Sequence, residues 1–90
     1  MPSYLVETYL PRGRVEQRTT LDRRAREAAE QLTRERTQVR FERSIHVPED
    51  EICFYVFRAA SAPAAALAAE RAELHPIRVV EALSSKKEEQ

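Results

Sequence analysis

The feature that most constrains the fold of this chain is the order in which two hydrophobic periodicities follow one another. Four short segments alternate apolar and polar residues or are continuously apolar, as β-strands are, and two longer segments repeat apolar residues every three or four positions, as helices do. Proline, glycine and acidic residues separate these segments. The predicted elements, in chain order, are a strand at 3–10, a helix at 20–36, strands at 39–47 and 52–57, a helix at 61–74 and a strand at 77–83.

Strand, helix, strand, strand, helix, strand is the split βαβ order. Right-handed crossovers fold this order into a four-stranded antiparallel sheet with both helices on one face, the ferredoxin-like arrangement of an α+β domain. The first and third strands are then central. The side chains predicted to face the helices are Val6, Phe41, Ile45, Phe54, Val56 and Val79. Those predicted to line the uncovered face are Leu5, Glu7, Tyr9, Ser44, His46, Cys53, Tyr55, Phe57 and Val80.

Both helices carry recognisable start signals. Thr19 is followed three residues later by Asp22, which resembles a capping box at the start of the first helix. Ser61 is a typical N-cap for the second helix, and Pro63 lies in its first turn, where a missing N–H does no harm.

The chain has 90 residues, which is about one small domain. We predict one ferredoxin-like domain over residues 1–83 and a disordered polar tail over 84–90. Bulky apolar residues are few, and a monomer of this size buries only about 60% of the surface that its unfolded chain exposes, so we expect a homodimer. Tyr55 and Phe57 are the aromatic residues expected to cover its interface.

Charge and cysteine content narrow the partners and the compartment. Fifteen basic residues balance fifteen acidic ones, so no long-range field attracts nucleic acid or an anionic membrane. The only cysteine, Cys53, has no partner for an internal disulfide, and the first residues lack the pattern of a signal peptide. No apolar run approaches the length of a membrane span. These features predict a soluble cytoplasmic protein.

A candidate metal site follows from the expected strand register. If the hairpin places His46 opposite Cys53, then Ser44 lies opposite Tyr55, and the central first strand brings Glu7 alongside. Imidazole with thiolate or carboxylate suits nickel, zinc, copper or iron. Each residue also has a structural interpretation: His46 as a surface residue beside a turn, Cys53 as a small buried apolar side chain, and Glu7 as an exposed or paired carboxylate.

The segment RSIHVPEDEICFYVF, followed by an alanine-rich helix and then IRVVEAL, resembles a family of small bacterial ferredoxin-like domains of unknown function. One branch of this family is described as nickel-binding, with dimeric members that hold nickel through histidines and neighbouring donors. The resemblance therefore implies a nickel-binding homodimer. His46, the one histidine in the matching segment, is its expected principal ligand, with Glu7, Cys53 and Tyr55 as neighbours.

Two other functions use the same uncovered face. The first is a small-molecule-binding protein or enzyme, with a pocket on the open sheet and His46 as general base. The second is an RNA-binding module in which Tyr55 and Phe57 stack on bases. The neutral charge and the absence of glycines and basic residues from CFYVF disfavour this second function.

Overall fold

The computed structural model describes residues 1–83, so the predicted disordered tail at 84–90 lies outside the described residues. Its regular elements are β1 (Ser3–Tyr9), α1 (Arg18–Arg34), β2 (Val39–Val47), β3 (Ile52–Ala59), α2 (Ala62–Arg71) and β4 (Arg78–Ala82). Two short 3₁₀ helices, Arg12–Gln17 and Pro48–Asp50, precede α1 and β3. The order of strands and helices is the predicted one.

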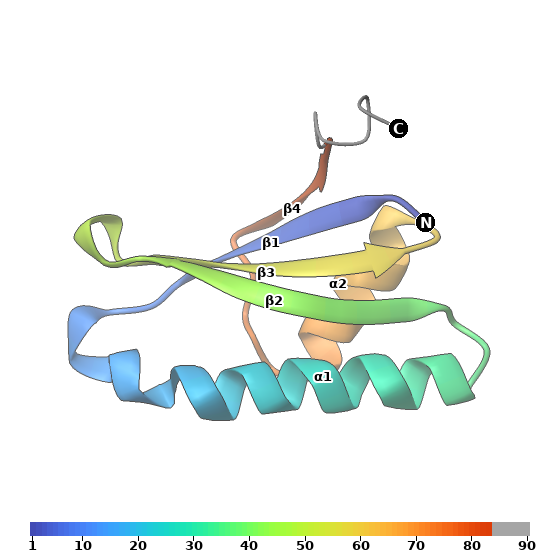
Figure 1. Cartoon of the computed structure of the whole chain (residues 1–90), viewed down its shortest axis with the longest axis horizontal. Coiled ribbons are helices and arrows are strands. Elements are labelled where there is room, and N and C mark those ends of the chain that lie inside the picture. Colours follow the sequence, from blue (N-terminus) through green and yellow to red (C-terminus); the bar gives the residue numbers. More distant parts are fainter. Residues whose placement is uncertain (84–90) are drawn as a thin grey trace.

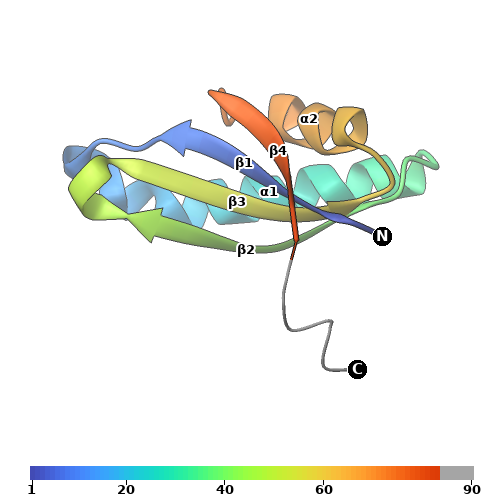
Figure 2. The same cartoon turned by 90° about the horizontal axis from the view of Figure 1, so that it is seen from above.

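The four strands form one antiparallel sheet in the order β2-β3-β1-β4. Both helices lie on the same side of this sheet, and the other side is left uncovered (Figures 1 and 2). The ferredoxin-like α+β fold is therefore confirmed, with β3 and β1 in the centre as expected. No helix of residues 1–83 has the length and apolar character needed to cross a membrane.

The sheet faces differ from prediction along β3. Its helix-facing side chains are Cys53, Tyr55, Phe57 and Ala59, all of them buried in the core, whereas Phe54 points to the uncovered face. The predicted assignment of Cys53, Tyr55, Phe57, Phe54 and Val56 was therefore wrong. Every residue from Ile52 to Phe57 is apolar or aromatic, so the pattern did not distinguish the two faces.

The faces along β2 change at a β-bulge. Phe41 pairs with Phe57 and Arg43 pairs with Val56, so Glu42 is an extra residue without a partner of its own. The extra residue turns Ser44 and His46 toward the helices and Ile45 away from them, the reverse of the prediction. The sequence signal of this bulge is Arg43. It is the one charged residue among the alternate positions Val39, Phe41, Arg43, Ile45 and Val47.

The assignments along β1 and β4 were correct. Val6 is fully buried and Val79 packs against the core, while Leu5, Glu7 and Val80 lie on the uncovered face.

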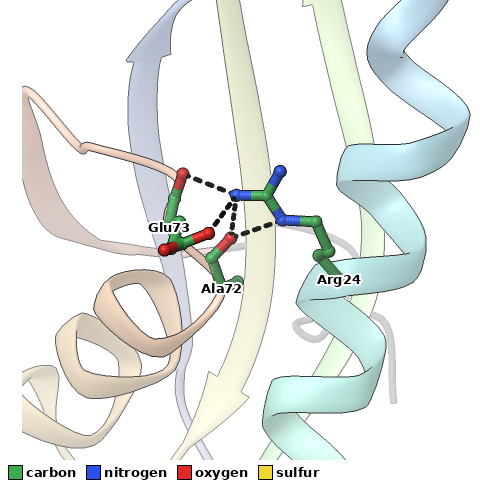
Figure 3. Close-up of polar contacts among 3 residues, drawn as sticks. All are labelled: Arg24, Ala72 and Glu73. Atoms are coloured by element: carbon green, nitrogen blue, oxygen red, sulfur yellow. Dashed lines mark hydrogen bonds and ion pairs between the residues drawn. The ribbon is translucent and has the colours of Figure 1, made fainter.

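Arg24 of α1 joins the two helices under the sheet (Figure 3). Its guanidinium donates to the carbonyl oxygen of Ala72 from Nη2 at 2.6 Å and from Nε at 2.9 Å, and to that of Glu73 at 3.0 Å. Glu73 has a positive φ of 60° just past the end of α2, where the last carbonyls of a helix have no partner within it. Arg24 thus caps α2 and holds its C-terminal end against α1.

The two predicted helix starts had different outcomes. Ser61 caps α2 as expected, accepting a hydrogen bond from the Ala64 amide at 3.3 Å. The capping box at Thr19 and Asp22 was wrong: α1 begins at Arg18, its N-cap is Gln17, and no side chain caps it. Asp22 lies inside the helix and is used elsewhere.

Candidate functional site

The four predicted metal ligands do not come together, because the sheet separates Glu7 from the other three. Glu7 lies on the uncovered face, where its carboxylate accepts a hydrogen bond from Arg78 Nε at 2.7 Å. His46, Cys53 and Tyr55 lie on the helix side of β2 and β3. The predicted ligand role of Glu7 in this group is thus corrected: its charge is paired with an arginine of β4.

The predicted hairpin register is confirmed. His46 lies directly opposite Cys53, and Ser44 lies opposite Tyr55. Side chains in directly opposed positions of an antiparallel pair have Cβ atoms about 4.5–5.5 Å apart, so imidazole and thiol are neighbours. Cys53 is fully buried, which agrees with its interpretation as a small buried apolar side chain. His46 is half-buried. His46 is therefore not available on the open face as the general base of a pocket there.

The first turns of α1 add two residues that the sequence analysis did not include. Ser44 Oγ donates to Asp22 Oδ2 at 3.1 Å and accepts from Arg18 Nη2 at 3.3 Å. Ser44 thus links α1 to β2 by hydrogen bonds, two residues from His46 on the same face of the strand. Together these side chains form what we call the polar cluster: Arg18, Asp22, Ser44, His46, Cys53 and Tyr55.

A signal for Arg18 and Asp22 was present in the sequence. Residues 18, 22, 25 and 29 follow one another at spacings of four, three and four, which places them on one face of a helix. Ala25 and Ala29 are buried in the core, so this face points inward and carries Arg18 and Asp22 with it. The capping-box prediction placed Asp22 at the start of the helix and therefore did not include it among the inward-facing residues.

The polar cluster holds every buried side-chain nitrogen or oxygen in residues 1–83 that has no hydrogen-bond partner. These atoms are Arg18 Nε, Asp22 Oδ1, His46 Nε2 and Tyr55 Oη. Burying a polar atom without a partner costs about 1–3 kcal/mol, and native proteins rarely leave such atoms unmatched. Four such atoms in one cluster indicate a site that binds a polar molecule, either ordered water or a small ligand.

Burial also controls ionisation in the polar cluster. Desolvation raises the pKa of the Cys53 thiol, and the nearby Tyr55 hydroxyl and Arg18 charge offset this only in part. Desolvation and the neighbouring Cys53 likewise raise the pKa of Tyr55. Both groups are therefore neutral at neutral pH, and the Tyr55 hydroxyl near Cys53 retains a proton that it can donate.

The side chains of the polar cluster include the donor types that bind transition metals, but they are not arranged around a common metal position. Imidazole, thiol and carboxylate are all present in the polar cluster, and two of the orphaned atoms, His46 Nε2 and Asp22 Oδ1, are potential metal donors. Within the described part of the chain, however, no three His, Cys, Asp or Glu side chains are close enough together to hold a metal ion as they stand. A metal here would use the cross-strand pair and require a side chain to turn toward it.

The fold and the polar cluster define a ferredoxin-like α+β protein with polar groups buried between the first helix and the sheet. Its sequence matches no family model and no curated protein. A solved structure with a similar fold is that of SCO4226 from Streptomyces coelicolor A3(2), with a TM-score of 0.61 and 17% sequence identity, covering 92% of this chain and 99% of that chain. At this identity, the similarity supports the fold and carries no functional argument.

Proposed function

We propose that this protein binds a divalent transition-metal ion, nickel above all, at the polar cluster, with His46 and Cys53 as its ligands. The observation that carries the proposal is the buried, unpartnered Nε2 of His46 on the strand position opposite Cys53. A metal ion bound there would supply the missing partner of this nitrogen. The resemblance of residues 43–57 to a family with a nickel-binding branch implies His46 as the principal ligand, with Cys53 among its neighbours.

The composition of the site favours a borderline ion. A neutral imidazole and a thiolate suit nickel, zinc or copper, whereas magnesium and calcium prefer oxygen donors alone. Asp22, whose Oδ1 also lacks a partner, is the candidate third donor because it lies in the same cluster. Turning its carboxylate toward the ion would release Ser44 from one of its two hydrogen bonds.

The remaining members of the cluster would assist the thiolate. Cys53 must lose its proton to become a ligand, and its raised pKa opposes that loss. The Arg18 charge and the Tyr55 hydroxyl both favour the thiolate form of Cys53. Metal binding should therefore release a proton and strengthen as pH rises, while Tyr55 acts as a hydrogen-bond donor to the sulfur rather than as a ligand.

The proposal is tested with untagged protein, because a polyhistidine tag itself binds nickel. Nickel stoichiometry is measured by elemental analysis after gel filtration, and affinity by titration calorimetry. We expect one ion per chain, and we expect His46→Ala or Cys53→Ser to weaken binding by about 100-fold or more. A thiolate-to-nickel charge-transfer absorption should appear in the native protein and disappear in Cys53→Ser.

Two variants serve as matched controls. His75→Ala removes the other histidine, which is exposed in the loop before β4, and Glu7→Gln removes the predicted ligand on the opposite face. Both should bind nickel within about twofold of the native protein. Absence of retained nickel, zinc or copper at neutral pH, or equal binding by His46→Ala and His75→Ala, contradicts the proposal.

We also propose that the protein is a homodimer that pairs through the uncovered sheet face. The supporting observation is that this face carries Leu5, Ile45, Phe54 and Val80 with no helix over it. Ion pairs of Glu7 with Arg78 and of Glu42 with Arg58 lie on the same face. Apolar residues edged by paired charges are typical of protein interfaces.

A free buried thiol as a ligand is in keeping with the reducing cytoplasm.

A further inference from the structure

A groove of about 670 Å³ lies between α1 and β2, away from the polar cluster. One wall is a single face of α1, from Arg26 to Arg34. The other is Gln38 and the start of the edge strand β2, from Val39 to Phe41. None of the residues that line it belongs to the polar cluster. Its volume lies within the range of small-molecule sites, about 300–1,000 Å³.

The floor of the groove is apolar. Ala29, Val39 and Phe41 contribute to it from the core, and the Met1 side chain borders it. Such a surface favours the apolar body of a ligand, since removing it from water is favourable by about 25 cal/mol per Å².

The rim of the groove is cationic. Arg26 and Arg34 of α1 line it, and neither side chain forms a hydrogen bond or an ion pair with another described residue. Arg24, Arg71 and Arg78, by contrast, are each paired with a carboxylate. Among the described residues, Glu30 is the only acidic one that lines the groove, so one carboxylate lies beside the two guanidinium groups of α1.

The Arg26 charge lies directly against the apolar floor. Its guanidinium carbon is 5.6 Å from the centre of the Phe41 ring, which is the geometry of a cation–π contact. A guanidinium held beside an apolar surface can form two parallel hydrogen bonds with a carboxylate whose chain lies along that surface.

We propose that this groove binds an amphipathic anion, a small molecule with an apolar body and a carboxylate head. The body lies on Ala29, Val39 and Phe41, and the head pairs with Arg26 or Arg34 of α1. The two features that carry the proposal are the apolar floor and the two α1 arginines at its rim, whose side chains have no partner among residues 1–83. This ligand site is independent of metal binding at the polar cluster.

The test compares three probes that share one apolar chain and differ in the charge of the head: decanoate, decanol and decylamine. Each is titrated below its micelle-forming concentration, and binding is followed by calorimetry and by backbone amide NMR shifts. We expect decanoate to bind at least about tenfold more tightly than decanol, decylamine to be the weakest, and the shifts to gather on α1 and the start of β2.

Variants then separate the groove from general surface charge. Arg26→Gln together with Arg34→Gln should weaken decanoate binding by about tenfold or more, with folding unchanged by circular dichroism. Arg14→Gln together with Arg23→Gln, two exposed arginines outside the groove, should leave it unchanged. Nickel binding should be the same in both double variants.

Three results would overturn the proposal. They are no decanoate binding, equal binding of decanoate and decylamine, and an equal loss in the two double variants. Preferential binding to anionic lipid vesicles over free decanoate would assign the groove to a membrane surface instead. A dimer that dissociates in the Arg26 and Arg34 variant would assign it to a second copy of the chain.

Discussion

At the scale of single residues, ionisation in the polar cluster follows from burial. Cys53 and Tyr55 are the two titratable side chains that the core encloses most completely, at 0% and 1% exposure. Enclosure disfavours the charged form of each, so both pKa values are raised from their ordinary values of 9.0 and 10.0. The consequence is a folded state that holds two protons more tightly than the unfolded chain does.

The free energy of unfolding should therefore fall in alkaline solution. A raised folded-state pKa stabilises the protein fully below the unfolded pKa, and this stabilisation is lost as pH rises above it. The decline should begin near pH 9.0 for the thiol and near 10.0 for the phenol. Urea denaturation of metal-free, reduced protein at a series of pH values measures it.

Two substitutions and one control identify the groups. Cys53→Ala should remove the earlier part of the decline, and Tyr55→Phe the later part. Tyr9→Phe, which alters a tyrosine that is 60% exposed, should keep the whole decline. A pH dependence that is the same in all three variants would show that the cluster does not control it.

At the scale of elements, β2 decides which residues meet α1. The bulge at Glu42 adds one residue between two regular stretches of pairing, Phe41 with Phe57 and Arg43 with Val56. Because side chains alternate with a period of two, one extra residue exchanges the faces of everything that follows it. Ser44 and His46 reach the polar cluster for this reason, although the pattern of β2 predicted the opposite face for them.

Deleting Glu42 should leave the protein folded, with His46 still opposite Cys53. The pairs on either side of the bulge would become consecutive, and only the ion pairs of Glu42 with Arg43 and Arg58 would be lost. Such partly exposed pairs contribute about 0–1 kcal/mol each. Urea denaturation and nickel titration should both give values close to those of the native protein.

Deleting Ile45 is the matched comparison. It removes one residue beyond the bulge and turns His46 to the other face, so we expect loss of nickel binding and a destabilisation above about 3 kcal/mol. If the Glu42 deletion were as damaging as the Ile45 deletion, Glu42 would not be an extra residue in the strand.

At the scale of the whole molecule, the two faces of the sheet have different partners. The helices cover one face (Figure 2). The polar cluster lies between that face and α1. The other face has apolar side chains and no cover within residues 1–83. A second copy of the chain is the partner that we propose for it.

Replacing Ile45 and Val80 together by Glu should convert the dimer to a monomer. Both lie on the uncovered face, on its two edge strands, so four added charges in the dimer would be buried against apolar surface. Sedimentation equilibrium measures the mass. Leu67→Glu, a change of an exposed residue on α2, should leave the dimer intact. A native protein that sediments as a monomer would exclude the pairing.

The sequence by itself determined the order of the elements, the ferredoxin-like topology, the cap of α2 and the register of the β2–β3 hairpin. These depend on local periodicity, on turn residues and on the handedness of crossovers, all of which are readable along the chain. Opposition of His46 and Cys53 follows from the hairpin alone, which is why this part of the candidate site was predicted.

The tertiary structure alone decided which face these residues occupy. Both faces of β3 are apolar, so only the packing of α1 and α2 selects Cys53 and Tyr55 over Phe54 for the core. The same packing brings Arg18 and Asp22 to the cluster from another element and leaves Glu7 across the sheet with Arg78. A strand period of two specifies which residues share a face, but the choice between the two faces depends on what packs against each of them.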